Sequence, residues 1–214
     1  MTLPASLSAV IFDLDGVLWD STPIHARAYY QVLETENILE FSYSQYAGMT
    51  TKECLKQIFR LQGRDVSEAK LEELSSMKSR LALQALESHP PVLAGCRNLI
   101  ETLRLKRRVA LASSASPATV ELFLKASGCG GLFSTVLNAS SVNRHKPAPD
   151  IYLKACELLK ADPSKVLVVE DAVAGIVAAK AAGTSVWAVD STCPADALLA
   201  AGADHVMHSL NELL

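Results

Sequence analysis

The sequence predicts an α/β protein with a doubly wound parallel sheet and an all-helical segment inserted after the first strand. Short apolar runs alternate with helix-like patterns over most of the 214 residues. The runs are continuously apolar, which is typical of strands that are covered on both faces. Such alternation predicts a parallel sheet with right-handed crossover connections. One long stretch near the N-terminus breaks it, because that stretch holds helical patterns but no convincing strand.

The expected strands and helices follow one another along the chain. Strand-length apolar runs lie at 8–13, 108–113, 134–137, 166–170 and 185–189, with a weaker run at 205–207. Helical patterns lie between them at 95–106, 117–127, 149–160, 172–182 and 195–201. Pro117 and Pro149 suit first helical turns, and Gly128 and Gly183 stand where helices are expected to end.

The segment 22–88 holds three helix-like patterns, near 23–37, 51–62 and 67–87. The sequence His89-Pro90-Pro91 marks the return to the sheet, since prolines stiffen a connection. We therefore expect two structural units. Residues 1–20 and 90–214 form the α/β core, and residues 21–89 form a helical domain.

Composition indicates an ordinary globular protein. Hydrophobic residues make up 50% of the chain, charged residues 20%, and the net charge is −3. No charge run suggests a nucleic-acid or membrane partner. Five cysteines stand singly, which indicates free thiols in a reducing compartment. The N-terminus lacks a basic region before its short apolar stretch, so we expect a cytoplasmic protein without a targeting signal.

Two aspartates follow the first expected strand in the sequence VIFDLDGVLWDS. Residues two apart in an extended strand point to the same side, so Asp13 and Asp15 present both carboxylates beyond the strand's carboxyl end. Ligands of open α/β sheets bind at that edge. Gly16 lets the chain turn sharply and leaves room for a ligand. The alternative is a solvated aspartate turn.

Three more groups of polar residues follow later strands. Ser113 and Ser114 lie in LASSAS, where hydroxyls and backbone amides suit a phosphate at the start of a helix. Lys146 stands in KPAPD, and Glu170 and Asp171 end VLVVED. Taken singly, each group fits a helix cap or an exposed loop. Their coincidence at one edge of one sheet favours a functional site.

The motifs FDLDGVLWDS, LASSAS, KPAPD and VVEDAVAG resemble, in this order, the four motifs of the haloacid dehalogenase superfamily of phosphotransferases. The resemblance covers essentially the whole chain. Within the superfamily the chain is similar to the branch of beta-phosphoglucomutase and small sugar-phosphate phosphatases, whose helical cap follows the first motif. The resemblance therefore implies a Rossmann-like core with the helical segment as its cap.

The resemblance also implies roles for the motif residues. Asp13 is the nucleophile that forms an aspartyl-phosphate, and an ordinary aspartate, with a pKa near ~3.9, is ionised at neutral pH without a base. Asp15 is the general acid and base, a role for which we expect a pKa raised by neighbouring carboxylates. Lys146 bridges Asp13 and the phosphoryl oxygens, which Ser113 and the amide of Ser114 also bind.

Three carboxylates around a phosphate dianion make sense only with a hard divalent cation. The resemblance implies Mg²⁺, bound by the side chain of Asp13, the carbonyl of Asp15 and Asp171. Glu170 is then either a further ligand or a residue that supports the ligands.

In the cap, the resemblance points to fewer residues. His25 matches a histidine near the catalytic acid, with a packed helix histidine as the alternative. Thr51 and Lys52, which follow Thr50, resemble the substrate-specificity loop. Lys78 falls near a lysine that holds the mutase's distant phosphate, but we expect it on a solvated helix face.

Three residues depart from the family pattern or are unusual for it. His145 stands where the family often has glycine, and Arg144 precedes it; each either adds charge at the mouth of the site or faces solvent. Trp19 is large for a hinge, and we expect it to pack on the cap or on the substrate.

The predicted function is a Mg²⁺-dependent phosphatase of a small phosphorylated metabolite, a sugar or polyol phosphate. The first alternative is a sugar-phosphate mutase of the beta-phosphoglucomutase type, and the second a non-catalytic regulatory protein with the same fold. The only expected partner is the phosphomonoester substrate, and a monomer is the expected oligomeric state.

Overall fold

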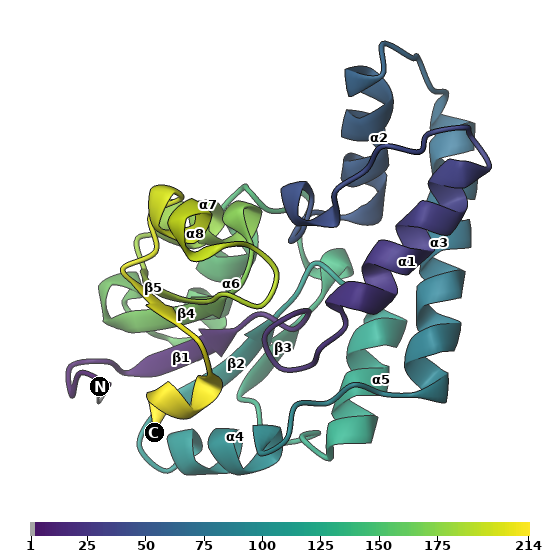
Figure 1. Cartoon of the computed structure of the whole chain (residues 1–214). Helices are drawn as coiled ribbons and strands as arrows, with labels where there is room; N and C mark the ends of the chain where they lie inside the picture. The colour runs from purple at the N-terminus through teal and green to yellow at the C-terminus, as the bar shows by residue number, and fades with distance from the viewer. Residues whose placement is uncertain (1–2) are drawn as a thin grey trace.

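The computed structural model describes residues 3–214 and has a six-stranded parallel sheet at its centre (Figure 1). The strand order is β3-β2-β1-β4-β5-β6. The strands are β1 (Ala9–Phe12), β2 (Arg108–Ala112), β3 (Thr135–Leu137), β4 (Val166–Glu170), β5 (Ser185–Val189) and β6 (His205–Met207). From β1 the chain adds strands first on one side of the sheet, as β2 and β3, and then on the other side, as β4, β5 and β6. Ligands of open α/β sheets bind at such a switch point.

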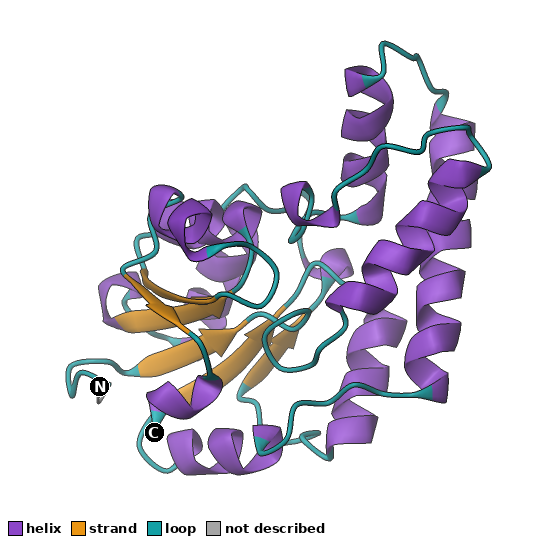
Figure 2. Ribbon diagram, in the orientation of Figure 1, coloured by secondary structure: helices purple, strands orange, loops and turns teal. Residues whose placement is uncertain are grey.

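Helices cover both faces of the sheet (Figure 2). The core helices are α4 (Cys96–Arg104), α5 (Pro117–Ser127), α6 (Asp150–Leu159), α7 (Val173–Ala181) and α8 (Ala195–Ala200). Alternate residues of β1 go to opposite layers: Val10 and Phe12 pack with α4 and α5, whereas Ala9 and Ile11 pack with α6, α7 and α8. Burial on both faces explains why these strands are continuously apolar.

The segment between β1 and α4 forms a separate helical layer beside the carboxyl ends of the strands (Figure 1). It comprises α1 (Thr22–Glu34), α2 (Thr51–Leu61) and α3 (Glu68–Ser88). Its helices share an apolar cluster of their own, around Val32, Leu55 and Leu74. Two connecting stretches of the chain join this segment to the core. They are held together where the amide of Asp20 donates to the carbonyl of Pro91 at 2.8 Å.

Strand register brings the expected site residues together. Phe12 pairs with Leu111 of β2 on one side and Val169 of β4 on the other. The next residue along each strand therefore reaches the same edge, where Asp13 lies between Ala112 and Glu170. This is the edge that faces the helical segment.

The structure confirms the predicted fold class. Every predicted strand is present, and the predicted helices end within a few residues of the observed ones. Four short 3₁₀ segments were not predicted: 43–45, 139–141, 163–165 and 210–213. Over residues 3–214 the helices are all too short or too polar to span a lipid bilayer.

Candidate active site

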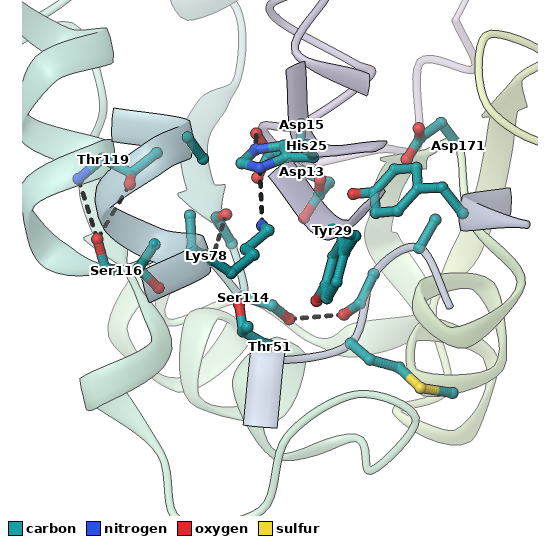
Figure 3. A pocket seen from close by; sticks show the side chains of 18 residues that line it. Asp13, Asp15, His25, Tyr29, Thr51, Lys78, Ser114, Ser116, Thr119 and Asp171 are labelled. Carbon is teal, nitrogen blue, oxygen red and sulfur yellow. Dashed lines mark hydrogen bonds and ion pairs between the residues drawn. The ribbon is translucent and has the colours of Figure 1, made fainter. Parts of the chain in front are cut away.

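A small cavity separates the carboxyl edge of the sheet from the helical segment, and both parts of the chain line it (Figure 3). Its volume is about 70 Å³. Asp13, Asp15, Ser113 and Asp171 lie on the core side, whereas Tyr29, Thr51 and Lys78 come from the helical segment. Predicted core residues and residues of the helical segment therefore face one space.

Lys146 ties two of the predicted carboxylates together beneath this cavity. Its Nζ lies 2.5 Å from Asp13 Oδ1 and 2.7 Å from Glu170 Oε1, and it donates to the carbonyl of Ala112 at 3.3 Å. Lys146 is 1% exposed. Although burial opposes charge on this ammonium group, Asp13 and Glu170 hold its pKa well above the usual value. Lys146 is therefore a permanent cation beside Asp13.

Glu170 has all its acceptor sites engaged by neighbours. Its Oε1 accepts from Lys146 and from the Tyr152 hydroxyl at 2.6 Å. Its Oε2 accepts from the amides of Asp171 at 3.0 Å and Ala172 at 3.2 Å. These bonds favour a role in holding Lys146 and the loop over direct metal binding, one of the two roles left open above.

Asp13, Glu170 and Asp171 form a buried acidic cluster whose oxygens lie within 4.8 Å of one another. Burial and the neighbouring Glu170 raise the pKa of Asp171 well above its usual value. Burial raises the pKa of Asp13 to about 7, although Lys146 opposes the change. A reference pKa therefore overstated how readily Asp13 ionises. A divalent cation among these hard oxygen donors would restore ionisation, so the cluster fits a Mg²⁺-type metal.

Gly16 gives Asp171 the space that it occupies. The glycine has φ +75°, and a Cβ added there would lie 1.9 Å from Asp171 Oδ2. Both the left-handed backbone and the close approach exclude a side chain. The sharp turn expected at Gly16 is present, but the space beside the glycine holds Asp171, and Gly16 does not line the cavity.

Asp15 is held by three donors from the segment that follows it. Its Oδ1 accepts from Ser21 Oγ at 2.6 Å, from Trp19 Nε1 at 2.9 Å and from His25 Nε2 at 2.9 Å. Burial raises the pKa of Asp15, but His25 and these hydrogen bonds outweigh it and lower the pKa below its usual range. The expectation of a raised pKa was wrong, because the donors had not been foreseen.

His25 and Lys78 extend this arrangement across the helical segment. Lys78 Nζ lies 2.9 Å from His25 Nδ1 and 4.5 Å from the centre of the Tyr29 ring. His25 is 7% exposed and Lys78 6%. The expectation that Lys78 faces solvent was therefore wrong. Burial lowers the pKa of Lys78 to about 8, and burial together with Lys78 lowers the pKa of His25.

Trp19 packs into the apolar core and does not line the cavity. Its side chain is fully buried, and its ring meets Phe123 of α5 edge-on with centroids 5.5 Å apart. The indole N–H donates to Asp15. Its apolar cluster also includes Leu86 of α3, so of the two expected packing partners the structure is consistent with the cap and not with a substrate.

The serines that follow β2 lie at the base of the cavity. Ser113 is buried, and its Oγ accepts from the amide of Ala115 at 3.0 Å. Ser114 lines the cavity and donates to the carbonyl of Gly48 at 2.7 Å. Ser114 thus also connects the core to the helical segment, which its motif did not predict.

The structure separates Thr51 from Lys52. Thr51 lines the cavity, whereas Lys52 is half-exposed and lies 2.9 Å from Glu68 Oε2 in an outer groove. Lys52 is thus not brought to the predicted site. His145 also borders the outer groove, and Arg144 is exposed and pairs with Asp150 at 2.9 Å.

Sequence reasoning missed several residues of this site: Ser21, Tyr29, Tyr43 and Tyr152. A signal existed for Lys78, because it falls on the buried stripe of α3 formed by Leu71, Leu74, Ala82 and Leu86. A lysine on an apolar stripe requires a partner inside the protein. Ser21 is the last residue of the first motif, whereas Tyr29, Tyr43 and Tyr152 lie outside the motifs, and their spacing carries no such signal.

Comparisons with known proteins agree with this arrangement. The family model of the haloacid dehalogenase-like hydrolases matches residues 7–183. A phosphorylated carbohydrates phosphatase of Thermotoga maritima is 31% identical, over 97% of this chain and 100% of its own length. The beta-phosphoglucomutase of Bacillus subtilis is 29% identical, over 97% of this chain and 92% of its own length. The crystal structure of a hydrolase from Pseudomonas syringae has a TM-score of 0.85 at 27% identity, covering 93% of this chain and 92% of that chain.

Proposed function

The chain belongs to the haloacid dehalogenase-like hydrolases, and on that premise we propose that it is a Mg²⁺-dependent phosphatase of a small sugar or polyol phosphate. The observation that supports this most is that Asp13 and Asp15 lie together at the sheet edge but have different contacts. Asp13 contacts a buried lysine at 2.5 Å, and Asp15 faces the same cavity within a separate set of donors. Two carboxylates thus have two environments, as a nucleophile and a proton carrier require.

Asp13 provides the nucleophile. One of its carboxylate oxygens attacks phosphorus, and the bond between phosphorus and the ester oxygen breaks, leaving an aspartyl-phosphate. The positive charge of Lys146 stabilises the negative charge on Asp13 and on the phosphoryl oxygens. Ser113 and the amide of Ser114 bind those oxygens from the start of α5.

Asp15 carries the proton. A phosphate dianion that enters the cavity adds negative charge beside Asp15 and raises its pKa, so the residue can take up a proton and pass it to the leaving oxygen. The ionised Asp15 then accepts a proton from the water that attacks the phosphoenzyme. Free phosphate leaves and Asp13 is restored.

The acidic cluster supplies the proposed metal site. Mg²⁺ would be held by the side chains of Asp13 and Asp171 and by the carbonyl of Asp15. When bound, the ion offsets the negative charge that gathers between the carboxylates and the phosphoryl group. Glu170 fixes Lys146 and the loop beside it.

We also propose that residues 21–89 form a cap domain that closes over this site. The cap residues Thr51, Lys78 and His25 reach the cavity, which is too small to admit a sugar phosphate without opening. Closure would exclude water from the reaction.

A panel of phosphomonoesters tests this function. We expect release of inorganic phosphate from sugar or polyol phosphates in the presence of Mg²⁺ and its loss in a chelator. The variant Asp13→Asn should lose turnover, whereas Asp196→Asn, which alters an exposed aspartate of α8, should keep it. Full activity of Asp13→Asn would rule out the mechanism.

A sugar-phosphate mutase is the second candidate, because the mutase of Bacillus subtilis matches nearly the full chain. In a mutase, a sugar hydroxyl takes the place of water in the second step. Incubation with beta-glucose 1-phosphate and a trace of the bisphosphate, followed by phosphorus NMR, separates the two. Isomerisation without free phosphate would favour the mutase.

A further inference from the structure

The charges on the cavity wall indicate what kind of leaving group the site accepts. We propose that the substrate is a monophosphate ester of a neutral, hydroxyl-bearing small molecule, and that the site discriminates against esters with a second phosphate. The proposal rests on the proposed function, since it concerns the leaving group of the same reaction.

The first observation is the shortage of cations around the cavity. Among the residues that line it within 3–214, the basic side chains are His25 and Lys78, against the acidic Asp13, Asp15 and Asp171. Lys146 lies beneath the cavity and contacts Asp13 and Glu170. Its charge, with that of the proposed metal ion, is therefore directed at the phosphoryl group that is transferred.

The second observation is that Lys78 is already engaged. Its ammonium group donates to His25 Nδ1 at 2.9 Å and lies over the Tyr29 ring. This donation leaves the imidazole proton on Nε2, from which His25 donates to Asp15 at 2.9 Å. Figure 3 shows His25 between Asp15 and Lys78. The positive charge of Lys78 thus supports Asp15, and a second phosphate would have to break this chain of hydrogen bonds to use it.

The third observation concerns the outer groove, which shares Thr51, Ser79, Ser114 and Ser116 with the cavity. The lysines that line this groove form ion pairs with glutamates. Lys52 pairs with Glu68 at 2.9 Å and with Glu72 at 3.6 Å, and Lys56 lies 4.0 Å from Glu68. An anionic group that extended into this groove would therefore find lysines whose positive charge is already balanced by glutamates.

The cavity wall offers hydroxyl groups instead. Thr51 and Ser79 lie on the cap side with Tyr43, and Thr119 on the core side. The hydroxyls of Tyr43 and Ser79 make no hydrogen bond to any other residue of the described range. A hydroxyl both donates and accepts, which suits the hydroxyl groups of a sugar or polyol. A phosphate dianion is an acceptor only and needs charged donors when it is desolvated.

Matched pairs of substrates test the proposal. Fructose 1-phosphate is compared with fructose 1,6-bisphosphate, and glucose 1-phosphate with glucose 1,6-bisphosphate, at one pH. We expect kcat/KM for release of the 1-phosphate to be at least tenfold lower for each bisphosphate. Equal or higher values would overturn this inference but leave the phosphatase intact. No phosphate release from either pair or from any ester of the panel would instead refute the proposed function.

A variant that adds a cation provides a second test. Thr51→Lys places a positive charge on the cap wall, and Thr51→Gln is the neutral control of similar length. We expect the ratio of kcat/KM for bisphosphate over monophosphate to rise at least fivefold in the lysine variant relative to the glutamine variant. An unchanged ratio would count against the proposal. Ser79→Lys and Ser79→Gln, at an exposed position of α3, repeat the comparison if melting curves show that a Thr51 variant does not fold.

Discussion

At the residue scale, Asp15 shows most clearly how neighbours set a side chain's chemistry. One of its oxygens accepts three hydrogen bonds, and the third comes from His25. Lys78 contacts the other ring nitrogen of His25. A carboxylate fixed in this way has one orientation toward the cavity. His25 and Lys78 are therefore positioning residues, because they act on the reaction through Asp15.

We predict that His25→Asn and Lys78→Met each lower kcat by about 10²-fold or less, as expected when a general acid and base is misplaced but retained. Because both act through one hydrogen-bond chain, the double variant should lose much less than the product of the single losses. Steady-state kinetics of the four proteins measure this coupling. Losses that multiply would show that the two residues act independently.

A second prediction at this scale follows from the buried carboxyl groups. Burial raises the pKa of Asp13 to about 7 and that of Asp171 well above its usual value. Between about pH 5 and 7 the folded chain then holds protons that the unfolded chain has released, so without a divalent cation its stability falls as pH rises. The lowered pKa of Asp15 acts only in more acidic solution.

Mg²⁺ competes with those protons, so the rise in Tm that it causes should be larger at pH 7.5 than at pH 5.5. Thermal unfolding with Mg²⁺ and with a chelator measures both values, and about 2–4 °C corresponds to 1 kcal/mol in a chain of this size. Asp13→Asn should reduce the difference between the two pH values. An equal rise at both would argue against metal binding at these carboxylates.

The residues of the four motifs could be predicted from the sequence, because three of the motifs lie directly at the end of an apolar strand and the fourth, with Lys146, precedes a proline-led helix start. The environment of each could not. The donors to Asp15 lie in the segment after Gly16 and in α1, so their positions depend on the turn at Gly16. Lys78 reaches the site from α3, 53 positions from His25 along the chain. Such contacts depend on how α1 and α3 pack, which no local pattern encodes.

At the element scale, the turn after β1 determines where the carboxylates lie. We predict that Gly16→Ala loses metal affinity and activity as well as stability, because a Cβ there would lie 1.9 Å from Asp171 Oδ2. Gly63→Ala is the matched control, since it has φ +65° with no atom within 4 Å. The control should lose about 1–2 kcal/mol from backbone strain alone.

Denaturant unfolding should therefore show a loss for Gly16→Ala that exceeds the control by about 1–3 kcal/mol, the usual cost of overpacking. Phosphate release should be unchanged in the control and strongly reduced in Gly16→Ala. Equal losses of stability in the two variants, with activity retained in both, would show that Asp171 does not depend on this close approach.

The elements themselves were the most predictable part of the fold. β4 is buried along its whole length and α5 begins at a proline and ends before a glycine, so hydrophobic pattern and capping signals agreed. The 3₁₀ segment at 43–45 was missed because three residues carry no period. That segment includes Tyr43, which lines the cavity, so the omission extended to the substrate side of the site.

At the scale of the whole molecule, the apolar cluster of the cap and the two clusters of the sheet are joined by few polar contacts. The cap has its own cluster, and the sheet has one on each face. Besides the hydrogen bonds of Ser21 and His25 to Asp15, Ser114 donates to Gly48 at 2.7 Å and the hydroxyls of Thr22 and Thr192 lie 2.7 Å apart. Cys193 Sγ lies 3.4 Å from the carbonyl of Ser44. An interface with so few polar links suits parts that separate and close again.

The bond between Ser114 and Gly48 is one of the links between cap and core at the cavity, so we predict that Ser114→Ala favours the open form. A neutral hydrogen bond contributes about 0.5–1.5 kcal/mol, which corresponds to roughly a 2- to 12-fold shift between closed and open forms. Amides of residues 43–49 should exchange with deuterium faster by that factor, while those of β1 and β4 stay protected. Ser134→Ala, at an exposed position before β3, is the control and should leave the exchange of both regions unchanged. If exchange in 43–49 is the same in Ser114→Ala as in the control, this hydrogen bond does not hold the cap closed, and closure must depend on the other links between cap and core, such as the bond of His25 to Asp15, and on the bound substrate.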